Sequence, residues 1–413
     1  MKNTMQNCNW ISWMRLAAAT ALAFAAVLVL AFITTITTQS AEAQTLTVLY
    51  TFTGAADGGQ PYGGVIQDSA GNLYGTTGTG GNLADCSGVG CGTVWKLDTA
   101  GTETVLYSFA GGTADGSSPL AGVIRVGSKF YGTTQYGGAY GYGTVYELSS
   151  KGETVLHSFC VVVNQSVNCD SGASPTTGVV YSAGTLYGTT PSGGNVGYGA
   201  VYELSNGAET ILHNFAWNYY GEPFDGYTPE SGLTRDSAGN LYGTASGGGI
   251  YGAGILYEIS ASGTYTILHN FAWNSNGTPY DGLNPEAPVI LDAAGDLYGT
   301  TSQGGTYGNG TVWKLSASGS YTILHNFVGG SEGALPYGSV VKAGSTIYGT
   351  TTQGGAYDAG TVWELSKTGV LTVLSSMGGS DYGGVIRDAA GNLYGATFNG
   401  GAYNFGTVWK LTP

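Results

Sequence analysis

The sequence predicts an all-β protein: a seven-bladed β-propeller closed by its N-terminal strand and preceded by a signal peptide. Two observations predict the propeller. A unit of four short β-type runs occurs seven times, with steps of 46 to 57 residues between equivalent positions. The fourth run is also displaced along the chain, with one copy ahead of the first unit and none after the last. Repeats of this length with four strands are typical of propeller blades.

The unit is clearest between Val289 and Phe327. Its four runs are VIL, DLYGTT, GTVWKL and YTILHNF, and they are separated by DAAG, SQGGTYGN and SASG. β-branched and aromatic residues fill the runs, whereas Gly, Ser, Asn and Asp fill the gaps, which is the composition of strands joined by tight turns. One unit is therefore expected to form one four-stranded antiparallel sheet.

Two aromatic positions define the repeat. The second run carries an aromatic–Gly pair, with the aromatic at Tyr74, Tyr131, Tyr187, Tyr242, Tyr298, Tyr348 and Tyr394. The third run centres on Trp95, Tyr146, Tyr202, Tyr257, Trp313, Trp363 and Trp409. Because aromatic side chains bury large areas, the third-run series is expected to fill the interfaces between blades.

The fourth run indicates how the ring closes. It follows the third run in six units, whereas the last unit stops at Leu411, just after its third run. A seventh copy, TVLYTF at residues 47–52, lies alone before the first unit. A ring that uses its first strand to complete its last blade produces this offset and removes the free sheet edges. An open solenoid needs no such exchange, so 28 strands in a closed ring are expected.

Residues 1–43 have the features of a signal peptide. Two basic residues precede an apolar run over about residues 16–36, and Ala-Glu-Ala at 41–43 has the small-x-small form of a cleavage site. The apolar run is also close to the length that spans a bilayer, so an uncleaved N-terminal anchor is the alternative. Export is expected, with residues 44–413 forming the propeller and containing no membrane span.

Four cysteines remain after residue 43, in the local pairs Cys86/Cys91 and Cys160/Cys169. Each pair lies in a loop insertion that the other units lack. An even number of cysteines at short spacings in an exported protein indicates two disulfides that pin loops. A metal site is the alternative, but no cluster of Cys or His accompanies either pair, so no metal and no other cofactor is expected.

The chain is acidic and poor in charge. It has 12 basic and 26 acidic residues, a net charge of −14, and only 9% of its residues are charged. An acidic surface with so few Lys and Arg residues argues against nucleic acid or an anionic membrane as a partner. Glycine is abundant, with 73 residues, and it recurs at turns and strand ends, where positive φ or close approach of neighbouring chains requires it.

The recurring LYGTT, GG, GTVWKL and TVLHSF segments resemble the GloVer tandem repeat, named for Gloeobacter and Verrucomicrobium. The resemblance covers about residues 45–412. It implies a bacterial exported repeat protein of the kind found among "choice-of-anchor" surface proteins, and it implies no catalytic residue. Some members end in a sorting segment, whereas this chain ends on its last strand.

An acidic residue occurs in every loop that leads into a first strand: Asp57, Asp115, Asp170, Asp225, Asp281, Glu332 and Asp381. One interpretation is a turn-forming residue that hydrogen-bonds its own backbone. The other is a ring of carboxylates near the channel mouth that binds a cation or sugar hydroxyls. A calcium loop would place several oxygen ligands within one short segment, and no unit does so.

The basic residues of the first strands also repeat. Arg125, Arg235 and Arg387 occupy the same position, and Lys342 aligns with them. They are expected to pair with the neighbouring acidic ring inside a polar channel, or to hold an anionic ligand such as an acidic sugar. The four histidines share one position in the outermost strand, which indicates packing or surface exposure rather than a catalytic base.

Aromatic residues in the loops of units four and five break the sevenfold symmetry. They lie beside Asp225 and Asp281 and comprise Trp217, Tyr219, Tyr220, Trp273 and Tyr280. A loop aromatic commonly packs on its own loop, but exposed Trp and Tyr beside carboxylates are also what sugar rings stack on. These residues, with the three arginines, form the candidate ligand site.

Two functions follow from the sequence. The first is a non-catalytic, monomeric exported propeller that binds a glycan or a surface protein, and near-equivalent repeated sites favour it. The second is a polysaccharide lyase or hydrolase, which requires an asymmetric set of reactive groups. No Ser/His/Asp arrangement or metal-ligand spacing departs from the repeat, although a glycosidase could use two of the ring acids. Binding is therefore preferred over catalysis.

Overall fold

The computed structural model describes residues 44–163, 166–216, 225–272 and 281–412. Within these ranges the regular structure is β, apart from one 3-10 turn, η1 (Cys86–Gly88), and no helix is long and apolar enough to span a membrane. Residues 45–412 form one compact unit. The predicted signal peptide, residues 1–43, lies outside the described residues.

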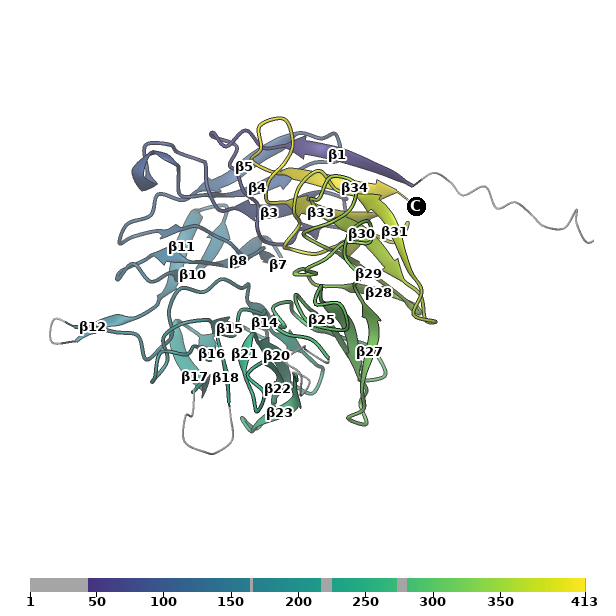
Figure 1. The fold of residues 1–413 in the computed structure, drawn as a ribbon. Helices are drawn as coiled ribbons and strands as arrows, with labels where there is room; N and C mark the ends of the chain where they lie inside the picture. The colour runs from purple at the N-terminus through teal and green to yellow at the C-terminus, as the bar shows by residue number, and fades with distance from the viewer. Residues whose placement is uncertain (1–43, 164–165, 217–224, 273–280, 413) are drawn as a thin grey trace, which may run out of the picture. The chain divides into compact units, whose positions relative to one another are not determined.

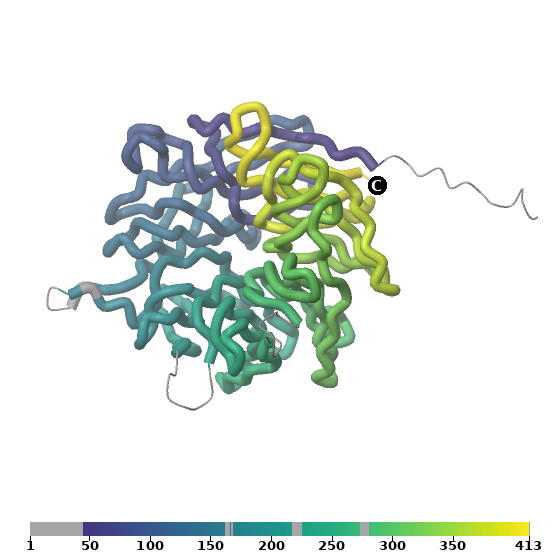
Figure 2. Tube along the Cα trace, viewed as in Figure 1, coloured from purple at the N-terminus to yellow at the C-terminus, as the bar shows by residue number. Residues whose placement is uncertain are grey.

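The unit is a seven-bladed β-propeller, and each blade is a four-stranded antiparallel sheet (Figure 1). The fold class is therefore confirmed. The chain runs once around the ring, so the colours in Figure 2 follow one another from blade to blade. In the seventh blade the strand order is β1-β34-β33-β32, and the N-terminal strand lies beside the C-terminal one, as predicted.

The first, innermost strands have only two or three residues: β2 (Ile66–Gln67), β7 (Ile124–Val126), β14 (Val180–Ser182), β19 (Thr234–Arg235), β24 (Ile290–Leu291), β28 (Val341–Ala343) and β32 (Ile386–Arg387). The second strands are β3 (Leu73–Thr77), β8 (Lys129–Thr134), β15 (Thr185–Thr190), β20 (Leu241–Ala245), β25 (Leu297–Thr301), β29 (Thr346–Thr350) and β33 (Leu393–Thr397).

The third strands are β4 (Thr93–Leu97), β10 (Thr144–Ser149), β16 (Ala200–Ser205), β22 (Ile255–Ile259), β26 (Thr311–Leu315), β30 (Thr361–Leu365) and β34 (Thr407–Thr412). The fourth, outermost strands are β5 (Glu103–Ser108), β11 (Gly152–Ser158), β17 (Ala208–Asn214), β23 (Tyr265–Asn270), β27 (Tyr321–Asn326), β31 (Leu371–Ser376) and β1 (Thr45–Thr51).

Three small sheets, which the sequence does not predict, join the loops. In two of them the loop entering an inner strand pairs with the loop between the second and third strands, so both loop sets lie on one face. They are β6 (Gly116–Ser117) with β9 (Tyr136–Gly137), and β18 (Gly226–Tyr227) with β21 (Gly247–Gly248). The third, β12 (Val161–Val163) with β13 (Ser166–Asn168), is a hairpin within one loop.

The third-strand aromatics fill the core between blades, as expected. All seven are at most 1% exposed, and each ring lies on the glycine of the paired second strand. A Cβ atom on Gly299 would lie only 2.4 Å from Cζ2 of Trp313, which explains why the aromatic–Gly pair recurs. Phe271, from the preceding blade, packs against Trp313 with ring centroids 5.6 Å apart.

Adding one methyl group at this position should therefore destabilise the ring. We expect Gly299→Ala to lower the free energy of unfolding by about 2 kcal/mol, because the tightly packed Trp313 side chain must move. Urea denaturation measures the change. Gly319→Ala, in a turn where nothing lies within 4 Å, is a control for the general effect of removing a glycine, although its positive φ adds some strain of its own. An unchanged midpoint for Gly299→Ala would contradict the packing argument.

Candidate functional site

A pocket of about 340 Å³ lies at the propeller axis. Each blade contributes the residue three positions before the buried Val or Leu that directly precedes its inner strand. These seven residues share one repeat position: Tyr62, Leu120, Thr176, Glu230, Glu286, Tyr337 and Tyr382. We call these seven residues the axial set. They belong to the loops that enter the inner strands, so the pocket lies on the face that carries both loop sets.

Small residues bring the blades close enough to form this pocket. The axial residue is followed by glycine in several blades, and the backbones of neighbouring blades approach each other directly there. A Cβ on Gly383 would lie 2.4 Å from the backbone nitrogen of Gly64, and one on Gly63 would lie 2.1 Å from that of Gly122. Any side chain at these positions would push the blades apart, so the glycines fix the width of the axis.

Tyrosine side chains form one side of the pocket. Tyr62 and Tyr382 come from adjacent blades and stack, with ring centroids 4.8 Å apart and an interplanar angle of 11°. Tyr337 lies next to them, 5.4 Å from Tyr382. Phe398, in the loop after β33, packs edge-on against Tyr62 and Tyr382 from outside the set. The rings are therefore held in place by their neighbours and form a preformed aromatic wall.

Two glutamates from blades four and five form another part of the lining. Burial raises the pKa of Glu286 to about 7, a hydrogen bond with Ser302 opposes the shift, and the charge of nearby Glu230 adds a smaller increase. Burial also raises the pKa of Glu230. Both carboxyl groups, in turn, contribute to raising the pKa of Tyr62, after burial and Tyr382. The two walls therefore lie within electrostatic range of each other.

Some polar atoms of the pocket form no hydrogen bond within the described residues. Oε2 of Glu286 and Oγ1 of Thr176 are buried and have no hydrogen-bond partner among the described residues. An unpaired buried acceptor costs free energy, which a bound ligand or water that donates a hydrogen bond would recover. Aromatic faces together with a few convergent polar groups are the usual composition of a small-molecule site.

The predicted acidic ring lies elsewhere, against the outermost strands. Asp225 accepts hydrogen bonds from Nε2 of His213 at 2.8 Å and from the hydroxyl of Tyr265, in the next blade, at 2.6 Å. Asp281 is bonded to Nε2 of His269 at 2.9 Å and to the backbone N–H of Ala272 at 2.6 Å. These carboxylates therefore anchor the loop and tie neighbouring blades together, and they do not line the axial pocket.

Asp381 differs from the other members of that series. It is fully buried and accepts hydrogen bonds from Nε1 of Trp409 at 2.9 Å and from the backbone N–H of Gly384 at 2.9 Å. The loop of the seventh blade is shorter, so Asp381 takes the position that proline holds before the other axial residues. Burial raises its pKa to about 7, although Trp409 opposes the shift.

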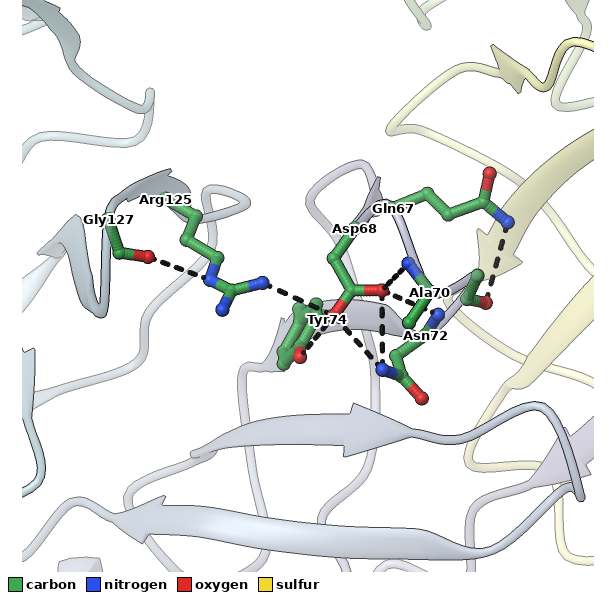
Figure 3. Close-up of polar contacts among 8 residues, drawn as sticks. Gln67, Asp68, Ala70, Asn72, Tyr74, Arg125 and Gly127 are labelled. Atoms are coloured by element: carbon green, nitrogen blue, oxygen red, sulfur yellow. Dashed lines mark hydrogen bonds and ion pairs between the residues drawn. The ribbon is translucent and has the colours of Figure 1, made fainter.

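The inner-strand cations pair with different acids from those expected. Nη1 of Arg125 lies 3.2 Å from Oδ2 of Asp68, which belongs to the turn between the first two strands of the preceding blade (Figure 3). Asp68 also accepts hydrogen bonds from Asn72 and Tyr74. Lys342 repeats the pairing with Asp292 at 3.1 Å. For Arg125 and Lys342 the predicted pairing with the acidic ring is therefore wrong, because both lie toward the turn at the far end of the inner strand.

The same cations also contact aromatic rings of the preceding blade. The guanidinium of Arg125 lies 5.5 Å from the ring centroid of Tyr74, that of Arg235 lies 6.0 Å from Tyr187, and that of Arg387 lies 5.7 Å from Tyr348. Cation–π contacts of this kind contribute to the cohesion of blades. None of the three arginines lines the axial pocket.

The remaining predicted residues fall into two groups. Trp217, Tyr219, Tyr220, Trp273 and Tyr280 lie outside the described residues. The structure joins Cys86 to Cys91 and Cys160 to Cys169 by disulfides, which are the two local pairs that the sequence indicates. Within the described residues, no group of three or more Cys, His, Asp and Glu could hold a metal ion.

The sequence patterns alone did not predict the axial set. The sequence nevertheless contains a signal for it. The residues on either side of this repeat position are nearly constant, whereas the position itself holds Tyr, Leu, Thr or Glu. Only the closed ring shows that seven residues about fifty positions apart meet at one point.

Together, the ring of sheets and the asymmetric pocket define a β-propeller with a pocket on its axis. The chain belongs to the Gloeobacter/Verrucomicrobia repeat family, whose model matches residues 32–245 and 229–413. The resemblance drawn from the repeat segments is thus confirmed. No curated protein matches the chain in sequence.

Solved structures share the fold. The extracellular domain of a hybrid two-component system protein from B. thetaiotaomicron is 12% identical, with a TM-score of 0.54; the match covers 90% of this chain and 41% of that one. A protein described as a 6-phosphogluconolactonase from Bacteroides uniformis is 13% identical, with a TM-score of 0.49, over 79% of this chain and 89% of that one. A gluconolactonase from Xanthomonas campestris is 12% identical, with a TM-score of 0.39, over 89% of each chain.

Proposed function

We propose that this protein is an exported bacterial propeller that binds a saccharide unit of a glycan in the axial pocket, without cleaving it. One observation supports the proposal most strongly. In a pocket of about 340 Å³, the stacked rings of Tyr62 and Tyr382 face the carboxyl groups of Glu230 and Glu286. The C–H face of a sugar ring can pack on the aromatic wall, while its hydroxyl groups donate to the carboxyl oxygens.

Three features support export. The pattern of residues 1–43 is that of a signal peptide, two disulfides pin loops, and the acidic chain is poor in Lys and Arg. Fractionation of cells that express the full chain, followed by N-terminal sequencing of the product, tests this part. We expect the protein outside the cytoplasm, beginning near residue 44; recovery of the uncleaved chain in the cytoplasm would contradict it.

A glycan array with the purified protein tests the binding. We expect a defined set of ligands, and we expect Tyr382→Ala to weaken binding at least tenfold because it removes one ring of the stack. Tyr357→Ala is the matched control, since this loop tyrosine is 72% exposed and lies outside the pocket. An array on which nothing binds, or binding that survives Tyr382→Ala and not Tyr357→Ala, would contradict the assignment of the pocket.

A polysaccharide-cleaving enzyme is the second candidate, and the pKa of Glu286 favours it. A carboxyl group with a pKa of about 7, next to a second carboxyl group, could donate a proton to a leaving group at neutral pH. Incubation of each bound glycan with the protein decides between the two: new reducing or unsaturated ends that disappear with Glu286→Gln identify an enzyme, and intact glycan identifies a binding protein.

A further inference from the structure

The charge of the axial pocket restricts its ligand. The lining contains the carboxyl groups of Glu230 and Glu286 and no Lys, Arg or His. Neither glutamate forms an ion pair with any described residue. Some acids elsewhere in the propeller are paired, such as Asp68 with Arg125 and Asp292 with Lys342. Others, such as Asp381, form no ion pair within the described residues but do not line the pocket. The pocket therefore combines unpaired carboxyl groups with a space that a ligand can enter.

An uncompensated pair of carboxyl groups in a partly desolvated pocket attracts a cation and repels an anion. The neighbouring tyrosines strengthen this preference, because an ammonium group over an aromatic face is stabilised by the ring quadrupole. The unpartnered Oε2 of Glu286 requires a hydrogen-bond donor, which a primary ammonium has and a quaternary ammonium lacks. A calcium ion would need six or more oxygen ligands, more than two carboxyl groups supply.

We propose that the saccharide bound in the axial pocket carries a protonated primary amine, as in a glycan that contains de-N-acetylated amino sugars. This inference rests on the proposed function, whose saccharide it specifies. The ammonium group lies between the two glutamates, and the sugar ring packs on the tyrosine wall. Glycans whose amines are acetylated lose the charge and retain the ring, so they bind more weakly.

Binding should also release a proton. Free Glu286, with its pKa raised by burial and by Glu230, is largely protonated at pH 6. A neighbouring ammonium favours the ionised carboxylate and lowers that pKa, so the proton leaves as the ligand binds. The measured binding heat at pH 6 then depends on the ionisation enthalpy of the buffer. In Glu286→Gln this dependence should decrease, and the part that is left comes from Glu230, whose pKa burial also raises.

Isothermal titration calorimetry of the full protein at pH 6 tests the proposal with four probes: a glucosamine oligomer, its fully N-acetylated counterpart, a neutral glucose oligomer of equal length, and ethanolamine. We expect the glucosamine oligomer to bind at least tenfold more tightly than the other two oligomers. Glu286→Gln should remove that preference, whereas Tyr357→Ala, outside the pocket, should keep it. Raising the salt concentration should weaken binding of the glucosamine oligomer alone.

The outcomes separate this inference from the function on which it rests. Equal affinity for all three oligomers overturns the amine and leaves a saccharide pocket. Binding of ethanolamine without any oligomer supports the amine and overturns the saccharide. Binding of no probe overturns both. Calcium that binds the protein and competes with the glucosamine oligomer would also overturn the amine, since it would identify the carboxyl pair as a metal site.

Discussion

Removal of β1 is expected to have the largest effect on stability of any change described for this protein. A chain that lacks residues 45–52 leaves β34 paired with β33 on one side and without its outer partner along the register from Thr407 to Thr412. It also loses Phe52, which is fully buried against Trp95 of the first blade, with ring centroids 5.6 Å apart. Loss of a buried phenylalanine alone costs about 3 to 5 kcal/mol, and the exposed edge of β34 adds a template for aggregation.

The deletion removes both the outer strand of the seventh blade and the chain crossing between the seventh and first blades. A circularly permuted chain can separate these two effects. Moving residues 45–52 behind Thr412, through an Ala-Ser-Gly turn copied from residues 317–319, restores the four strands of the seventh blade. The chain then no longer crosses the seam between the seventh and first blades. We expect the thermal midpoint to follow the order native, permuted, deleted, with the deleted form prone to aggregation. A permuted chain as unstable as the deleted one would show that the crossing, rather than the missing strand, closes the ring.

The sequence predicted this closure for a physical reason. The local sequence pattern determines which residues pair in neighbouring strands. This pattern occurs seven times, so each copy supports the strand assignment independently of the others. The displaced copy at residues 47–52 could therefore be assigned to the last blade by counting. The same redundancy explains why the burial of Trp313 and its equivalents could be foreseen, since each lies opposite the glycine that accommodates it.

The candidate site was less predictable because repetition does not determine it. Arg125 was expected to meet the acidic ring, but the direction of the inner strand brings it to the turn that holds Asp68. Asp381 shares its type with the ring acids, yet a shorter loop places it in the core beside Trp409. The axial set depends on seven loops that meet at the axis, and no local pattern reports the distance between Tyr62 and Tyr382.

The second large expected effect is a pH dependence of the free energy of unfolding, and it arises at the seam, the interface between the second and third blades. Oε1 of Glu209 lies 3.5 Å from Nε2 of His157, and both atoms are buried without a hydrogen-bond partner in the described residues. Burial raises the pKa of Glu209 to about 8 and lowers the pKa of His157. The folded state thus favours protonated Glu209, whereas the unfolded chain ionises it at its ordinary pKa of 4.5.

The sign of the effect follows from this difference. The contribution of Glu209 to stability is fully present below pH 4.5 and is lost as the pH rises through 8. With about 1.4 kcal/mol for each unit of pKa difference, the loss between pH 4 and pH 9 is on the order of 3 to 5 kcal/mol. Burial raises the pKa values of Glu103 and Glu153, at the same repeat position in the first two blades, to about 7, so they contribute in the same direction.

Glu209→Gln isolates this contribution, because glutamine keeps the shape of the side chain and does not titrate. Its amide can donate to Nε2 of His157, so the packing is retained. We expect the variant to match the native protein within about 0.5 kcal/mol at pH 4 and to exceed it by about 3 to 5 kcal/mol at pH 9, by urea denaturation. Glu364→Gln, on β30, removes one negative charge elsewhere and controls for the net charge. Two results would contradict this explanation. The free energy of unfolding could differ between Glu209→Gln and the native protein by the same amount at both pH values, or Glu364→Gln could reproduce the difference. Either result would mean that the buried carboxyl group between these blades does not set the pH dependence. Blades four and five have Tyr265 and Tyr321 in place of the glutamate, and these tyrosines stack on His213 and His269 with ring centroids 3.7 and 3.9 Å apart. Burial raises the pKa of both tyrosines above the ordinary value of 10, so these two interfaces should contribute no such loss between pH 4 and pH 9.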